Sequence, residues 1–104
     1  MITEEQFKAS MQESIRDLKG RVLFVTGPGR SGAIAAVYAS YYLGASFVPF
    51  GQPVPNKGTI LIIDTIEQSG KTLRKANKKY PDAIVMSVRG KKPTREHFWF
   101  EYQN

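Results

Sequence analysis

The sequence of 104 residues contains no cysteine, a single histidine and no long apolar run. Without cysteine, disulfides and thiolate metal sites are excluded. No stretch approaches the roughly 20 apolar residues that a membrane helix needs, and residues 2–19 are too polar for a secretory signal. We therefore expect a soluble cytoplasmic protein with one domain over residues 1–104, in which 1–19 form an N-terminal helix and 20–104 the core.

Acidic side chains are also scarce in the last third of the chain, where only Asp82, Glu96 and Glu101 oppose the basic residues. The net charge is +6, and the basic residues from position 71 onward are Lys71, Arg74, Lys75, Lys78, Lys79, Arg89, Lys91, Lys92 and Arg95. An anionic ligand or nucleic acid would suit this bias. A solvated helix face followed by a basic loop would produce the same composition.

Apolar periodicity alternates between strand and helix patterns. Helical spacing predicts helices over 3–18, 33–43 and 69–80, the first with a capping box at Thr3 and Gln6. Short apolar runs predict five strands over 22–26, 45–50, 59–64, 83–88 and 98–102. Because the runs at 22–26 and 59–64 do not alternate with polar residues, they are typical of a parallel sheet buried on both faces. The sequence therefore predicts an α/β domain with helices layered on a mainly parallel five-stranded sheet.

Two strand-to-helix junctions carry residues suited to phosphate. The first is Gly27-Pro-Gly-Arg-Ser-Gly32, where glycines let backbone N–H groups approach an anion and Arg30 can bind phosphate in a bidentate way. A tight turn is the structural alternative. The spacing is not that of a Walker A loop, because Ala33 stands where that motif has lysine.

The second junction is Asp64-Thr-Ile-Glu-Gln-Ser-Gly-Lys-Thr72. Ser69, Gly70, Lys71 and Thr72 offer hydroxyls, a flexible backbone and an ammonium at a helix start, which suits a phosphate monoester. Asp64, at the tip of a strand, can accept hydrogen bonds from sugar hydroxyls. The structural alternative is an N-capping Ser69 beside an exposed lysine.

The segment 61–73 resembles the signature of the type I phosphoribosyltransferases, in which an apolar strand and two acids precede Thr-Gly-x-Thr. Residues 22–44 resemble the pyrophosphate-loop segment of the same family. The resemblance covers most of the chain after Gly20. It implies a three-layer Rossmann-like fold and transfer of a phosphoribosyl group from phosphoribosyl pyrophosphate (PRPP) to a nitrogenous base, with release of pyrophosphate.

The resemblance also implies roles for the matched positions. They are Gln68, Ser69, Gly70, Lys71 and Thr72 for the 5-phosphate, Asp64 and Thr65 for the ribose, and Gly29, Arg30, Ser31 and Gly32 for the pyrophosphate. Mg²⁺ would bridge pyrophosphate and ribose oxygens, with Asp64 as an indirect ligand. The aromatic segment Phe98-Trp99-Phe100 resembles one that stacks on a purine, although packing along a sheet edge is the interpretation we favour for it.

The chain departs from the family pattern in several places. Thr65 replaces the second acid, and Gln68 stands where several purine enzymes carry an aspartate that acts as base. The loop 51–58 is shorter than the usual lid, and no separate hood subdomain is evident. No residue stands out as the catalyst, and we expect His97 to be a loop residue.

These departures leave two other functions open. One is a non-catalytic PRPP-binding regulatory module. The other is a sugar-isomerase type domain that binds a phosphosugar, because 25–32 is similar to the first glycine loop of that family. We also expect a homodimer, because Tyr38, Tyr41 and Tyr42 crowd one short helix. The resemblance favours a phosphoribosyl ligand over nucleic acid as the partner.

Overall fold

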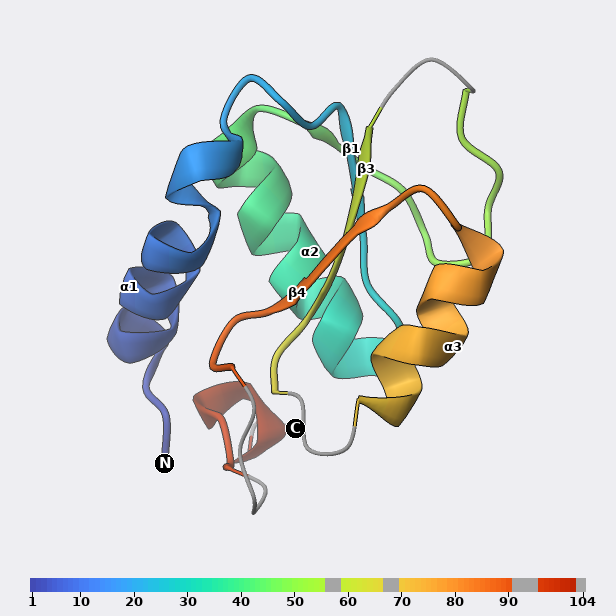
Figure 1. Cartoon of the computed structure of the whole chain (residues 1–104). Coiled ribbons are helices and arrows are strands. Elements are labelled where there is room, and N and C mark those ends of the chain that lie inside the picture. Colours follow the sequence, from blue (N-terminus) through green and yellow to red (C-terminus); the bar gives the residue numbers. More distant parts are fainter. Residues whose placement is uncertain (56–58, 67–69, 91–95, 103–104) are drawn as a thin grey trace.

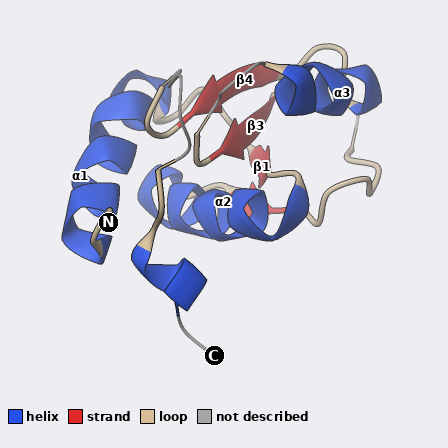
Figure 2. Cartoon of the chain, turned by 90° about the horizontal axis from the view of Figure 1, so that it is seen from below, coloured by secondary structure: helices blue, strands red, loops and turns tan. Residues whose placement is uncertain are grey.

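The computed structural model describes residues 1–55, 59–66, 70–90 and 96–102. Four parallel strands form one sheet in the order β2-β1-β3-β4. Their bounds are β1 Phe24–Thr26, β2 Ser46–Phe47, β3 Ile60–Asp64 and β4 Ile84–Ser87. Helices α1 (Glu4–Ile15) and α2 (Gly29–Leu43) lie on one face of the sheet, and α3 (Lys71–Lys79) lies on the other (Figures 1 and 2). The expected three-layer α/β fold with a parallel sheet is confirmed.

Helix α1 forms because its local signals agree with its packing. The capping box between Thr3 and Gln6 is present, and Phe7, Met11 and Ile15 recur on the buried face. A short 3₁₀ helix over Arg16–Leu18 continues α1. The Tyr38 hydroxyl of α2 donates to Glu4 at 2.6 Å, and burial together with this carboxylate raises the pKa of Tyr38 to about 12. The N-terminal helix is thus tied to α2.

The prediction of a fifth strand over 98–102 is wrong. Residues Trp99–Tyr102 form a 3₁₀ helix, and Phe98 makes an isolated parallel bridge with Ile2. In a strand, alternate side chains point to opposite faces. Here Phe98, Trp99 and Phe100 all contact Phe7, with ring centroids 5.8, 5.3 and 6.4 Å from it. The tighter 3₁₀ turn lets three consecutive aromatic rings reach the same core.

The second strand is shorter than expected, at Ser46–Phe47 instead of 45–50. The donors to β1 are the alternate residues Ser46 and Val48, so the nitrogen of Pro49 faces the open edge of the sheet, where proline is tolerated. The last ladder bond is donated by Val48 to the carbonyl of Val25 at 2.8 Å. Strand β2 is therefore a short, exposed edge. Among the described residues, no helix combines the length and the apolar character needed to cross a membrane.

We predict that Phe98→Ala lowers the free energy of unfolding by about 3–5 kcal/mol, the usual cost of removing a buried phenylalanine. Phe98 has no exposed surface and packs on Phe7. Urea denaturation followed by circular dichroism measures the change. The control is Leu23→Ala, because Leu23 is 56% exposed and its truncation should cost well under 1 kcal/mol. Equal losses in both variants would contradict the placement of Phe98 in the core.

Candidate functional site

The two phosphate-type junctions meet at one edge of the sheet. Strands β1 and β3 pair in parallel with Thr26 beside Ile62, so the residues that follow each strand leave the sheet side by side. In Figure 1, the first turns of α2 and α3 lie at the lower end of the sheet, where these strands end. In open α/β folds, the carboxyl ends of the strands are where ligands bind. The structure therefore brings the two sequence motifs together.

The first junction is tighter than expected, because α2 begins at Gly29 instead of residue 33 and the loop shrinks to Gly27 and Pro28. A Cβ atom on Gly27 would lie 2.0 Å from the Gly32 carbonyl oxygen and 2.6 Å from that of Ile63. Gly32 is also confined, because a Cβ atom there would lie 2.9 Å from the Gly27 carbonyl carbon. These two glycines are thus explained by backbone packing of the helix against both strands.

Gly29 has a different reason to be glycine. Its φ is +69°, and a Cβ there would meet nothing within 4 Å. The residue is exposed, as is Arg30 after it, and Ser31 is half-buried. Of the four residues expected to bind pyrophosphate, Gly29, Arg30 and Ser31 lie at the surface in the first turn of α2, while Gly32 is buried in the helix–strand contact.

The second junction begins at the end of β3, whose five residues are all buried. Asp64 is 9% exposed, and its Oδ1 accepts a hydrogen bond from the Thr65 backbone at 2.7 Å. Thr65, which replaces the second acid, is more deeply buried than Asp64. Gly70 adopts a left-handed conformation with φ 76° immediately before α3. Gln68 and Ser69, which the motif assigns to the 5-phosphate, lie outside the described residues.

Helices α2 and α3 present their N-termini to this edge. Within the described part of the chain, neither has a side-chain hydrogen bond at its N-cap residue, and neither has an acid in its first turn. Helix α1, in contrast, has a capping box and carries Glu4 and Glu5 in its first turn. The N-terminus of a helix is positively polarised, so Arg30 and Lys71 stand where a cation is unfavourable. An anion bound between the two N-termini would offset the unfavourable placement of these cations. It would also accept hydrogen bonds from the backbone N–H groups.

Thr26 adds a polar atom that the motifs above do not single out. Its side chain has no exposed surface, and its hydroxyl has no hydrogen-bond partner among the described residues. Because Thr26 pairs with Ile62, it shares the α3 side of the sheet with Asp64, two residues further along β3. A threonine that ends an apolar strand directly before a glycine is the sequence signal that marks this position.

Arg89, at the start of the basic loop, is held by structural contacts. Arg89 donates to both oxygens of Glu96, at 3.3 and 3.2 Å, and to the hydroxyl of Ser10 at 3.0 Å. This arginine therefore joins the two ends of the basic loop and fastens them to α1. Residues 91–95 lie outside the described residues, and His97 is an exposed residue outside helix and strand, as expected.

The aromatic segment does not offer a free stacking surface. Phe98 and Phe100 are buried, and their rings stack on each other with centroids 5.4 Å apart. Trp99 is half-buried and meets Tyr38 edge-on at 6.2 Å. These contacts agree with core packing of the segment, and they leave only part of Trp99 accessible.

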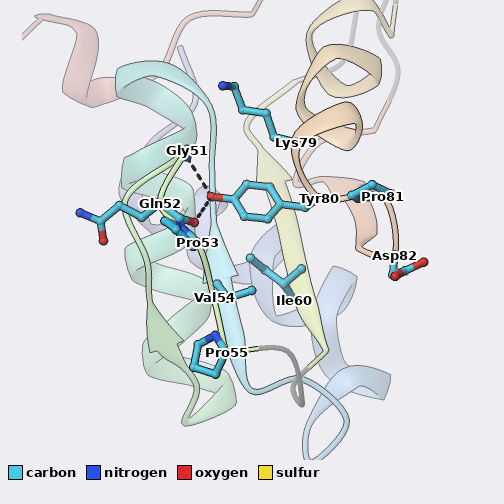
Figure 3. Close-up of a pocket in the computed structure, with 10 residues that line it drawn as sticks. All are labelled: Gly51, Gln52, Pro53, Val54, Pro55, Ile60, Lys79, Tyr80, Pro81 and Asp82. Carbon is cyan, nitrogen blue, oxygen red and sulfur yellow. Dashed lines mark hydrogen bonds between the residues drawn. The ribbon is translucent and has the colours of Figure 1, made fainter.

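The short loop after β2 is anchored to α3. The Tyr80 hydroxyl accepts a hydrogen bond from the Gly51 backbone at 2.8 Å and donates one to the Gln52 carbonyl at 2.7 Å (Figure 3). Tyr80 and residues 51–55 help to line a hollow of about 500 Å³. This hollow lies by Ile60, the first residue of β3, and is thus remote from the two junctions.

Several solved structures of one kind of enzyme share this fold. The chain matches a purine phosphoribosyltransferase from Pyrococcus horikoshii with a TM-score of 0.72 and 16% identity, over 96% of this chain and 94% of that one. It matches the xanthine-guanine-hypoxanthine phosphoribosyltransferase of Helicobacter pylori with a TM-score of 0.70 and 14% identity, over 96% and 90% of the two chains.

The chain has the phosphoribosyltransferase fold. An orotate phosphoribosyltransferase from Aeropyrum pernix also matches, with a TM-score of 0.62 and 12% identity, over 84% of this chain and 70% of that one. No protein-family model and no curated protein sequence matches the chain. The resemblance seen in the motifs is therefore confirmed at the level of the fold, and these matches favour it over a sugar-isomerase domain.

We predict that Gly27→Ala lowers the free energy of unfolding by at least about 3 kcal/mol, the upper end of overpacking costs. The new methyl group overlaps backbone atoms of Gly32 and Ile63, which cannot rotate away. Gly29→Ala is the matched control, because it meets no neighbour and should cost only the roughly 1–2 kcal/mol of a left-handed alanine. Urea denaturation compares the two, and an equal or smaller loss in Gly27→Ala would refute the backbone contact.

Proposed function

We propose that this protein binds PRPP together with Mg²⁺ and transfers its phosphoribosyl group to a nitrogenous base, releasing pyrophosphate. The observation that carries this proposal is the pair of helix N-termini beside Asp64 at one edge of the sheet, neither with a side-chain cap among the described residues. PRPP has an anionic group at each end of a ribose, so it can place one group on each helix N-terminus. The fold that the chain shares with three phosphoribosyltransferases supports the same conclusion.

The start of α3 would hold the 5-phosphate. Backbone N–H groups of its first turn, the Thr72 hydroxyl and the Lys71 ammonium supply donors to a dianion. The start of α2 would hold the pyrophosphate, where Arg30 and Ser31 lie near the surface. Asp64, between the two, would accept hydrogen bonds from the ribose hydroxyls. Gln68 and Ser69 keep their proposed role at the 5-phosphate on the strength of the motif alone.

A magnesium ion fits this site if the substrate supplies most of its ligands. Mg²⁺ prefers oxygen ligands and is usually held by one or two carboxylates together with phosphates. Asp64 is a buried carboxylate at the tip of β3, and Thr65 stands where the motif has a second one. In the described part of the chain, no cluster of three metal-ligating side chains exists. The ion would neutralise charge on the departing pyrophosphate.

The reaction would form a bond between C1 of the ribose and a ring nitrogen as the bond from C1 to the pyrophosphate oxygen breaks. Gln68 cannot take a proton from the acceptor, so base-assisted transfer of the kind available to an aspartate is absent. Tyr80 holds Gly51 and Gln52 against α3, which limits how far the short loop can close over C1. We expect slow transfer to a purine, with some PRPP lost to water.

A non-catalytic PRPP-binding module is the second candidate. The missing acid at position 65 and the short loop favour it, because both weaken catalysis more than binding. Measuring pyrophosphate release and nucleotide formation in one reaction separates the two candidates. Binding of PRPP without turnover on any base would select the regulatory module.

We predict that Thr72→Val weakens binding of PRPP in the presence of Mg²⁺ by roughly tenfold to a hundredfold. Losing a hydrogen bond to a charged group costs about 1.5–3 kcal/mol. Isothermal titration calorimetry measures the dissociation constant, and Lys71→Ala should weaken binding in the same direction. The control is Thr59→Val, an equal change at an exposed threonine next to the opposite end of β3. Unchanged affinity in Thr72→Val and Lys71→Ala would remove this junction from the site.

We also propose that two copies of the chain associate through the exposed face of α2. Val37 is 52% exposed and Tyr41 80% exposed. With Tyr38 and Tyr42, they line a shallow hollow of about 380 Å³, which also contacts Glu4 and Lys8 of α1. Burying this aromatic surface against a second copy would remove it from water.

We predict a dimer by size-exclusion chromatography with light scattering, and a dissociation constant at least about tenfold higher for Tyr41→Ser. Leu23→Ser replaces an exposed apolar residue directly before β1 that does not line this hollow and should leave the dimer intact. A wild-type monomer at high concentration would overturn the proposal.

A further inference from the structure

Helix α3 carries almost all of the net charge of the chain. Its nine residues include five basic side chains and no acid, namely Lys71, Arg74, Lys75, Lys78 and Lys79. The whole chain has a net charge of +6, so the difference left for all other residues together is +1. Net positive charge is therefore concentrated on this helix, and a second group of basic residues follows at Arg89, Lys91, Lys92 and Arg95.

Four of these basic side chains face solvent and have no acidic partner among the residues that the structure describes. Arg74, Lys75, Lys78 and Lys79 are exposed, and none of the four forms an ion pair within the described ranges. Among the described elements, α3 is also the one helix on its face of the sheet, as Figure 2 shows. Its outer side is thus open to a partner.

The helix dipole accounts for only some of the basic residues of α3. Basic residues in the last turn complement the helix dipole, which accounts for Lys78 and Lys79. Arg74 and Lys75 lie in the middle of the helix, where each stands three or four positions from another cation. Like charges at this spacing destabilise a helix. A polyanionic partner would turn this repulsion into attraction.

One flank of α3 adds an aromatic surface to the charge. Lys75 and Lys79 line a hollow of about 310 Å³ together with Phe50, Pro28, Thr72 and Ala76. Phe50 is half-buried, and the Lys79 ammonium lies 6.0 Å from its ring centroid. A hollow that combines two lysines with an aromatic ring matches a nucleotide, whose phosphate is anionic and whose base is flat.

We propose that the face formed by α3 and Phe50 binds single-stranded RNA, a function beyond the proposed transfer reaction, in a hollow that shares Thr72 with the proposed 5-phosphate site. The short helix suits a single strand, whose unstacked bases can enter the hollow, while the cations along α3 contact successive phosphates. A PRPP molecule at the start of α3 cannot account for these charges. Lys78 and Lys79 lie about 10 Å along the helix from Lys71.

Fluorescence anisotropy with a short labelled oligouridylate tests the proposal. If Arg74, Lys75, Lys78 and Lys79 neutralise four phosphates, affinity should fall about fiftyfold when salt rises from about 50 to 200 mM. The double variant Lys75→Gln/Lys79→Gln should bind more weakly, and over the same salt range its affinity should fall only about sevenfold. The matched control is Lys19→Gln/Arg21→Gln, which removes two exposed cations outside α3. The control should keep the fiftyfold salt effect.

Phe50→Leu tests the aromatic part of the surface. It should weaken RNA binding at least about fivefold while leaving the salt dependence unchanged, because stacking is lost and the charges remain. Thermal unfolding by circular dichroism verifies that each variant is folded. The proposal is overturned if the wild type does not bind at low salt, if both double variants respond to salt alike, or if polyglutamate competes as well as RNA.

Discussion

The close contact between Gly27 and Gly32 sets the geometry on which the rest of the protein depends. It lets α2 start directly after β1, and Gly27 at the same time lies against the backbone of β3 at Ile63. Since Asp64 is the next residue of β3, the start of α2 and the tip of β3 are forced to be neighbours. Backbone atoms make this contact, so no larger side chain at either position could preserve it. The candidate site is therefore a result of how closely one helix and two strands pack.

The helix N-termini and their cations make this edge of the sheet electrostatically positive. Helix α1 satisfies its own N-terminus with Thr3 and two acids. Among the described residues, helices α2 and α3 have no such side-chain cap, and each places a cation in its first turn. Stability alone would favour the arrangement of α1. Both exceptions are helices that begin at the carboxyl edge of the sheet, and the proposal of an anionic substrate rests on this arrangement.

Much of the fold follows from sequence because local signals and burial agree. The run Ile60–Asp64 is apolar up to its final acid, and the structure buries all five residues. The capping box of α1 also appears as expected. The prediction of a strand over 98–102 failed for a physical reason. Strand propensity depends on local sequence, whereas Phe98 and Phe100 pack in one core with Phe7, which is distant in sequence. For Gly27 and Gly32, the sequence allowed both close packing and anion binding, and only the distances between chain segments favour packing. The sequence also could not predict that the Thr26 hydroxyl has no hydrogen-bond partner among the described residues, because its neighbours are distant in sequence.

The bridge between Ile2 and Phe98 also bears on how the chain folds during synthesis. Phe7 lies within a few residues of the start of α1, and three of its ring neighbours come from Phe98–Phe100. Contacts this far apart in sequence form slowly, because a long loop must close first. While the ribosome still holds residues 98–100, the apolar face of α1 lacks these neighbours and stays available to chaperones. We therefore expect the packing around Phe7 to be completed only after Phe98–Phe100 emerge, even though the capping box of the first helix is local in sequence.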